Sequence, residues 1–261
     1  MTNHKYGFLI DASKCIDCRA CLISCSVENN VPMKHTRIWI KDTGIVGEYP
    51  ALTHYTAPFH CMHCTDPSCV SACTVGALQQ SEDGVVVYDD DRCIGCRYCM
   101  YACPFQVPHF EWEQQFALIA KCDMCFARLQ EGRQPACAAT CPSGAIQFGT
   151  REDMLAKAHE RIKSQPDRYV DHIFGEFENG GTSTFYISPV PFEQLGFPTT
   201  DRTASPAQAN REATEIGTPI IAGSVALGMT GIYLALEHKD AKHGNSQAEH
   251  AEITPAGTKE E

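Results

Sequence analysis

The sequence lacks the features of a nucleic-acid-binding protein and of common nucleotide-binding or hydrolytic enzymes. Its 261 residues carry 21 Lys and Arg against 32 Asp and Glu, a formal net charge of −11, and no basic cluster provides the positive face that nucleic acid requires. No Gly-rich phosphate-binding loop and no convincing Ser/His/Asp or paired-carboxylate signature is present. We therefore expect no nucleic-acid partner and no catalytic residues in this chain.

Cysteine, by contrast, is abundant: there are sixteen, all between Cys15 and Cys141. So many thiols are typical either of a disulfide-rich secreted protein or of a metal-binding one. The regular spacing of two and three residues favours metal ligands. Residues 1–14 contain no apolar segment of a signal peptide. On these grounds we expect a cytoplasmic chain, or one exported together with a signal-bearing partner.

The segment CIGCRYCMYACP, which begins at Cys93, has the spacing of a bacterial-type ferredoxin. Its first three cysteines wrap three irons of one 4Fe–4S cubane, whereas Cys103 ligates a neighbouring cluster. Pro104 then breaks the short helix. Zinc sites typically use pairs of CxxC and have no use for a third thiolate at this spacing. The segment therefore favours iron–sulfur clusters over zinc.

Three further runs of four cysteines repeat this pattern. Residues 15–25 have the same spacing 78 positions earlier, with Ser26 in place of the proline. Residues 61–73 have four residues between the second and third cysteines, and residues 122–141 have eleven there. Four such runs have the capacity for four 4Fe–4S clusters. Because irons ligated fully by cysteine leave no open position for a substrate, we expect an electron wire rather than an active site.

The pattern between the runs predicts an α+β protein with short strands at residues 6–10, 37–41, 77–80, 85–88 and 184–188. Asp83-Gly84 marks a hairpin turn between two of these strands. Thr150 and Asp153 predict a capping box at the start of a helix over residues 150–164. Residues 190–198 are expected to run extended over the surface, and residues 199–212 to form a polar linker.

Residues 216–236 form the longest uncharged run, with 21 residues. A helix of that length spans about 30 Å, which matches the apolar core of a bilayer. A buried hairpin or core helix is the alternative. We favour a membrane span over residues 213–238, because the run follows a linker and has no other core to join. Its small residues would admit a partner helix. Residues 239–261 are expected to be a polar, disordered tail.

Four charged or titratable residues lie beside the cysteine runs. His60 and His63 either tune a cluster or are simply solvated, and the sequence favours solvation. Lys121 and Arg97 either raise a cluster potential by their charge or are ordinary surface cations, and the sequence does not choose between these roles.

The segments CMHCTDPSCVSAC, CIGCRYCMYACPFQVP, KCDMC and GGTSTFYISPVPFEQLGFP resemble the beta, iron–sulfur subunits of membrane-bound respiratory oxidoreductases. These include the formate dehydrogenase-N type and the uptake nickel–iron hydrogenase type. The resemblance covers nearly the whole chain, including the single C-terminal span. Nitrate reductase beta subunits carry a tryptophan at one ligand position, whereas all sixteen positions here are cysteine.

The resemblance implies two interleaved ferredoxin modules, each holding two 4Fe–4S clusters, within residues 1–149. The second and third runs form an inner module, at about residues 52–115, and the first and fourth form the outer one. Residues 150–212 then follow as a capping helix, strand and linker. The implied ligand sets are Cys15, Cys18, Cys21 and Cys141 for cluster 1; Cys61, Cys64, Cys69 and Cys103 for cluster 2; Cys93, Cys96, Cys99 and Cys73 for cluster 3; and Cys122, Cys125, Cys137 and Cys25 for cluster 4.

The resemblance also implies a function as a non-catalytic electron-transfer subunit. Electrons from formate or hydrogen oxidation, in a molybdopterin or nickel–iron partner, would pass through the four clusters to a membrane cytochrome b and quinone. The cluster domain would lie on the periplasmic side of the cytoplasmic membrane. Two alternatives stay open. One is a wire that feeds a reductase for sulfur compounds, dimethyl sulfoxide or nitrite, and the other is a zinc-binding scaffold.

Overall fold

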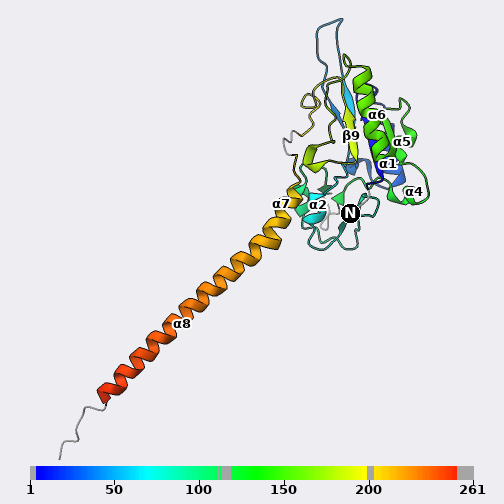
Figure 1. Ribbon diagram of the computed structural model, residues 1–261. Helices are drawn as coiled ribbons and strands as arrows, with labels where there is room; N and C mark the ends of the chain where they lie inside the picture. Colours follow the sequence, from blue (N-terminus) through cyan, green and yellow to red (C-terminus); the bar gives the residue numbers. More distant parts are fainter. Residues whose placement is uncertain (1–3, 111, 113–118, 199–202, 252–261) are drawn as a thin grey trace, which may run out of the picture. The chain divides into compact units, whose positions relative to one another are not determined.

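The protein was analysed as a computed structural model, which describes residues 4–110, 112, 119–198 and 203–251. The chain divides into two units, residues 1–208 and residues 209–261. Every cysteine and every described strand belongs to the first unit, where short elements surround one small sheet (Figure 1).

The centre of the first unit is a three-stranded sheet in the order β8-β1-β9. Strand β1 (Tyr6–Asp11) pairs antiparallel with β8 (Ile146–Thr150) and parallel with β9 (Thr184–Ile187). Phe8, Leu9 and Ile10 are completely buried. This continuous apolar run is the pattern of a strand covered on both faces. The predicted strands at residues 6–10 and 184–188 are confirmed.

One face of the sheet is covered by helix α6 (Arg151–Ser164) (Figure 1). Its Met154, Ala158 and Ile162 pack against Leu9 and its neighbours. The apolar positions recur every three or four residues, so they form one stripe on the helix. The helix begins at Thr150, whose Oγ1 accepts a hydrogen bond of 3.1 Å from the backbone N–H of Asp153. The predicted helix and its threonine cap are confirmed.

The other face of the sheet contacts an aromatic core. Phe174 lies with its ring centroid 5.2 Å from that of Phe192 and 5.0 Å from that of Phe197, and Tyr186 lies 4.9 Å from Phe197. Phe192 and Phe197 are 3% and 4% exposed. The prediction that residues 190–198 run over the surface is therefore wrong. The prolines direct the backbone, but the burial of these aromatic side chains decides where the segment lies.

The remaining elements are short. Three hairpins pair β2 (Trp39–Asp42) with β3 (Thr56–Phe59), β4 (Leu78–Gln80) with β5 (Val86–Tyr88), and β6 (His109–Phe110) with β7 (Ile119–Ala120). The helices are α1 (Ala20–Glu28), α2 (Ser68–Ser71), α3 (Tyr98–Ala102), α4 (Phe126–Gln130) and α5 (Ala136–Thr140), with 3-10 turns at Met33–His35 and Glu178–Gly180. The sequence predicted β2, β4 and β5 to within two residues but not β3, β6, β7 or β8.

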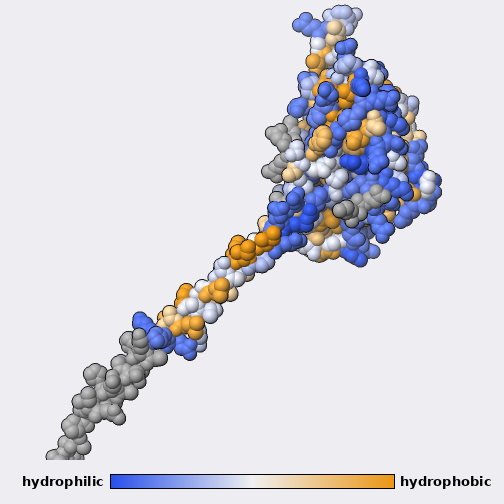
Figure 2. Space-filling view, in the orientation of Figure 1, coloured by the Kyte–Doolittle hydropathy of each residue, from blue (hydrophilic) through white to orange (hydrophobic). Residues whose placement is uncertain are grey.

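The second unit is helical. Helix α7 (Pro206–Glu212) continues through a π-helical segment (Ala213–Gly217) into α8 (Thr218–Ala251). The part over Pro206–Lys239 is long and apolar enough to cross a membrane by length and composition. From Ile216 to Leu236 its large apolar side chains are exposed (Figure 2). A core helix would be covered, so the buried-helix alternative loses support.

Two predictions about this region need correction. The predicted polar linker contains helix α7, and its residues 199–202 lie outside the described residues. The predicted disordered tail is helical as far as Ala251, because α8 continues past the end of the apolar run, and residues 252–261 lie outside the described residues. Polar residues such as Lys, Gln and Glu have good helix propensity, so a helix already begun can extend through them.

Gly175 provides a test of the packing beside the sheet. Its φ of +102° favours glycine, and an added Cβ would collide with the Thr184 carbonyl oxygen and lie 2.7 Å from Thr182 Oγ1. Gly175→Ala should therefore combine backbone strain with overpacking and cost roughly 3–5 kcal/mol. Gly132→Ala is the matched control, since its φ is +72° with no atom within 4 Å of the added Cβ. That variant should cost roughly 1–2 kcal/mol.

The measurement is the denaturant midpoint at which the full-length protein loses its cluster absorbance. Equal midpoints for the two variants would contradict the close packing of Gly175 against β9.

Candidate iron–sulfur cluster sites

All four cysteine runs begin with the same backbone turn. The residue just before the second cysteine has a left-handed conformation in each run, with φ of 49° at Asp17, 47° at His63, 68° at Gly95 and 58° at Met124. A left-handed residue of this kind turns neighbouring N–H groups towards one side and makes a concave site for an anion. The sequence repeat therefore corresponds to one repeated ligand loop.

In the outer module, two strands bring the first and fourth runs together. Strand β1 leads directly into the first run and β8 directly follows the fourth, and Ile10 pairs with Ile146. Helix α1 carries Cys21 and Cys25, while α5 carries Cys137 and has Cys141 at its C-terminal cap. Residues four apart lie on the same helix face, one turn apart. Each helix therefore presents one thiol to each of two neighbouring sites.

The inner module has the same construction on a hairpin. Strand β4 follows the second run and pairs with β5, which leads into the third run. Helices α2 and α3 carry Cys69 and Cys99, and Cys73 and Cys103 follow them. The Leu78 N–H lies 3.4 Å from Cys73 Sγ, and the equivalent Ile146 N–H lies 3.5 Å from Cys141 Sγ. Both amides follow the fourth cysteine of a run by five residues.

The sixteen cysteines are all free thiols, and the structure brings them together in four groups. Two groups line small cavities: group 1 is Cys15, Cys18, Cys21 and Cys141, and group 3 is Cys73, Cys93, Cys96 and Cys99. Within each group the thiols also interact electrostatically. Burial raises the pKa of Cys21 to about 12, and burial raises the pKa of Cys99 to about 12, with the other three thiols of the group adding to each rise.

The other two groups are more deeply buried. Burial raises the pKa of Cys64 well above its ordinary value, and Cys61, Cys69 and Cys103 raise it further. Burial also raises the pKa of Cys137 well above its ordinary value, and Cys125 and Cys25 raise it further. The pKa of Cys122 is raised in the same way, and Cys25 and Cys137 contribute to that rise. These thiols form group 2, with Cys61, Cys64, Cys69 and Cys103, and group 4, with Cys25, Cys122, Cys125 and Cys137. The assignment of each group to one cluster, as the resemblance implies it, stays a prediction.

Each group suits a 4Fe–4S cluster. Four soft sulfur donors surround one space, and no disulfide competes for them. Buried thiols with a pKa near 12 stay protonated at neutral pH. They lose their protons only when a metal cation binds and stabilises the thiolates. Iron supplies that charge. When bound, 4Fe–4S clusters provide one-electron redox centres.

Electrostatic interactions between thiols of different groups indicate that the groups form a series. The cross-group neighbours are Cys21 with Cys137, Cys122 with Cys61, and Cys69 with Cys99. The order is therefore group 1, group 4, group 2 and group 3. Of the sixteen cysteines only Cys18 and Cys96 are exposed, and these belong to the two end groups.

Comparison with known proteins agrees with this arrangement. Two family models, each described as a 4Fe-4S dicluster domain, match residues 8–74 and 52–151. The hydrogenase-2 operon protein HybA of Escherichia coli O157:H7 is 32% identical over 249 residues, which cover 78% of this chain and 76% of HybA. The iron-sulfur subunit of the nitrate-inducible formate dehydrogenase of Escherichia coli K12 is 34% identical over 200 residues, or 69% of this chain and 66% of that subunit.

A reductase-type relative matches as well. The Escherichia coli K12 protein named "Probable anaerobic dimethyl sulfoxide reductase chain YnfG" is 38% identical over 162 residues, or 59% of this chain and 77% of that protein. This chain belongs to the iron–sulfur subunits of respiratory oxidoreductases.

Two dicluster domains and sixteen cysteines fit four 4Fe–4S clusters, so the predicted cofactors are confirmed. The predicted role as an electron-transfer subunit is confirmed in the same way, and the zinc-scaffold alternative loses its support. The assignment of individual cysteines to clusters stays a prediction.

The two histidines of this iron–sulfur subunit lie inside it. His60 and His63 are both completely buried, so the prediction that they are solvated is wrong. His60 Nδ1 donates to the Cys61 carbonyl at 3.0 Å, and burial lowers the pKa of His60 to about 4. His63 Nδ1 accepts from the Val86 N–H at 3.2 Å, and burial lowers the pKa of His63 well below its ordinary value. Both rings are therefore neutral.

Two asparagines that contact thiols were not predicted. Asn29 Nδ2 lies 3.6 Å from Cys25 Sγ, and Asn179 Nδ2 lies 3.6 Å from Cys64 Sγ. Asn29 follows its cysteine by four residues, so helical spacing would have found it. Asn179 is 115 residues away from Cys64, and only the tertiary structure brings the two together.

The two cations beside the runs differ. Lys121 is 2% exposed, whereas Arg97 is half-buried, with its guanidinium 4.2 Å from the centre of the Trp112 ring. Lys121 is therefore not a surface cation. Burial raises the pKa of Cys69 well above its ordinary value, Cys61 raises it further, and the Lys121 ammonium lowers it. Lys121 thus lies close to group 2.

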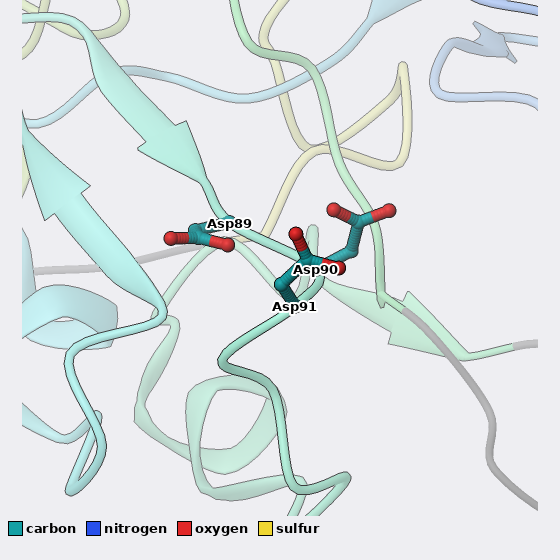
Figure 3. Close-up of side chains that lie close together, drawn as sticks. All are labelled: Asp89, Asp90 and Asp91. Carbon is teal, nitrogen blue, oxygen red and sulfur yellow. The ribbon is translucent and has the colours of Figure 1, made fainter.

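An acidic cluster follows strand β5. The carboxylates of Asp89, Asp90 and Asp91 lie within 4.8 Å of one another at the surface (Figure 3). Arg92 Nε is 3.0 Å from Asp89 Oδ2. Exposed carboxylates of this kind are well solvated and need no ion, so the cluster is not assigned as a metal site.

The fourth cysteine of the third run tests the grouping. Cys103→Ser should damage the cluster held by Cys61, Cys64 and Cys69, because Cys103 lies in group 2. The matched control Cys73→Ser should damage the cluster held by Cys93, Cys96 and Cys99 instead. Electron paramagnetic resonance (EPR) of the reduced complex, with its iron content, separates the two results. If Cys103→Ser removes only the cluster of its own run, the grouping is wrong.

Proposed function

We propose that this chain is the electron wire of a membrane-bound respiratory complex, with the four thiol groups as the ligand sets of its four clusters. The observation that carries the proposal is the serial order of the groups, together with the exposure of Cys18 and Cys96 at its two ends. A series with buried interior groups and accessible ends suits electron transfer from one partner to another.

The two ends of the series offer approaches for partners. Ile16 precedes the exposed Cys18 in its ligand loop and is itself 65% exposed, and Ile94 is 63% exposed in the equivalent loop of Cys96. Apolar side chains around an exposed ligand loop allow a partner to dock closely and exclude water. Between the ends, the completely buried Tyr186 lies close to Cys122 of group 4 and Cys61 of group 2. It excludes water where the two modules meet.

We assign group 3 to the membrane partner and group 1 to the catalytic subunit. The segment that leads to the candidate span begins against the inner module, where Ser205 Oγ donates to the Asp66 carbonyl at 3.0 Å and Ala207 is buried. The inner module therefore holds the last residues of the first unit, which lead into the candidate span, and group 3 is the end of the series within that module. Group 1 is left for the subunit that exchanges electrons with the substrate.

The helix over Pro206–Lys239 is proposed to cross the cytoplasmic membrane beside a cytochrome b or another quinone-reactive subunit. Ser224 Oγ donates to the Ile220 carbonyl at 2.8 Å, and Thr230 Oγ1 donates to the Ala226 carbonyl at 2.9 Å. These bonds satisfy the hydroxyl groups within the helix, as a bilayer requires. Gly223 and Gly228 allow close approach of a second helix. The family resemblance supports a periplasmic position for the cluster domain.

Nickel–iron hydrogenase and formate dehydrogenase are the two partner enzymes that we propose, since HybA and a formate dehydrogenase subunit both match the chain. The similarity to YnfG supports a second candidate, in which the same wire delivers electrons to a molybdopterin reductase. The hydrogenase, the formate dehydrogenase and the reductase would all use the same electron wire. They differ in the metal of the catalytic subunit or in the direction of electron flow.

The metal content of the native complex tests this function. The complex is purified in detergent through a tag on this subunit, and iron, labile sulfide, nickel, molybdenum, tungsten and zinc are measured. We expect roughly sixteen irons from this chain. Nickel without molybdenum identifies a hydrogenase, and molybdenum or tungsten identifies a formate dehydrogenase or reductase. Zinc without labile sulfide would falsify the wire.

Truncation before residue 216 tests the span. The clusters should remain, because every ligand lies before residue 142, but salt alone should now release the protein from membranes. Truncation after residue 239 is the control and should leave attachment unchanged, since it keeps the apolar run. Membrane fractionation, with salt and detergent extraction, measures both. A protein that lacks the span yet still fractionates with membranes and reduces quinone normally would show that the span is dispensable.

A further inference from the structure

The first unit contains one buried cation beside the thiol groups. Lys121 is the only Lys or Arg classed as buried among the residues whose side chains the structure describes. Its Nζ donates to the Val86 carbonyl at 2.7 Å and to the Cys122 carbonyl at 2.6 Å. In the described part of the chain, no carboxylate forms an ion pair with this ammonium.

Among the described residues, the buried carboxylates are paired. The buried carboxylate of Asp11 lies 3.1 Å from Arg161 Nη1 and accepts from the Tyr169 hydroxyl at 3.0 Å. The buried Glu178 lies 2.7 Å from His172 Nε2. A buried charge with only backbone dipoles around it carries a large desolvation cost. The positive charge of Lys121 therefore needs a compensating anion, which is present when the protein holds its clusters.

The surroundings of Lys121 identify that anion. Val86, whose carbonyl accepts from the ammonium, donates its own N–H to His63 Nδ1 at 3.2 Å, and His63 precedes Cys64 in the ligand loop of group 2. The ammonium also acts electrostatically on the Cys69 thiol of group 2. It also holds the carbonyl of Cys122, a member of group 4. A 4Fe–4S cluster with four thiolates carries net negative charge, and reduction adds one more negative charge. A nearby fixed cation favours the reduced form more than the oxidised form.

We propose that Lys121 is the built-in counter-charge of the cluster held by group 2, and that it raises the reduction potential of that cluster. The inference rests on the proposed ligand groups. Group 2 lies in the interior of the series, between groups 4 and 3, and the Lys121 side chain beside it is almost completely buried. Lys121 thus acts on the cluster only through its fixed positive charge, and it contacts no substrate.

Three substitutions separate the charge from the hydrogen bonds. Lys121→Gln removes the charge but keeps N–H donors for the two carbonyls. Lys121→Met removes both, and Lys121→Arg keeps the charge. Lys157→Met is the matched control, because Lys157 is exposed on helix α6 and water screens its charge. Each variant is made in the full complex.

Redox titration of the detergent-solubilised complex, followed by EPR, measures the effect. Lys121→Gln and Lys121→Met should lower the equilibrium constant for reduction of one cluster tenfold or more, which is about 59 mV for a one-electron couple. The other three clusters should shift less. Lys121→Arg and Lys157→Met should match the wild type. The affected signal should be the one that Cys103→Ser removes.

Two outcomes would overturn the proposal. In the first, all four potentials stay unchanged in Lys121→Gln while the iron content is retained. In the second, the Gln, Met and Arg variants lose the cluster equally, which would mean that Lys121 serves packing alone. A shift in a signal that Cys103→Ser does not remove would contradict the ligand grouping and leave the effect of the charge intact, so the two failures are distinguishable.

Discussion

Neighbouring thiol groups are coupled by cysteines four residues apart on one helical turn. Cys21 and Cys25 share helix α1, and Cys137 and Cys141 lie on and at the end of α5. The backbone between two such cysteines is too short to let their sites separate, so each pair of groups is held at a fixed spacing. Strand pairing then joins the two helices of a module: β1 with β8 in the outer module, and β4 with β5 in the inner one. The three-stranded sheet thus positions ligands as well as forming the core.

Burial sets the electrostatics of the interior. The buried thiols have raised pKa values, and His60 and His63 are neutral. These buried thiols and rings are thus uncharged until iron is bound, whereas Lys121 is buried beside them as a cation. This arrangement explains why a chain with so few long elements can be stable. Metal binding contributes the free energy that short strands and one-turn helices do not supply.

The two modules meet at a largely apolar and aromatic boundary, in which Lys121 bonds to Val86 of the inner module and to Cys122 of the outer one. Tyr186 on β9 lies close to Cys122 and Cys61, and the His60 ring lies 4.9 Å from that of Phe8 on β1. Phe174, Phe192 and Phe197 extend this packing to the segment that precedes the candidate span. Large side chains at this boundary give the interior groups a low local dielectric constant, in which the electrostatic effect of a single fixed charge is weakly screened.

The sequence by itself determined the ligand chemistry, because the spacing of cysteines within a run is a local constraint and each turn repeats it. It also determined β1, α6 and the apolar run over residues 216–236, whose patterns are long or strongly capped. The tertiary structure decided the rest. Which run shares a site with which depends on pairing between strands about 140 residues apart, such as Ile10 with Ile146. The burial of His63, Lys121 and Phe197 depends on neighbours that are distant in the chain, so it cannot be predicted from the local sequence.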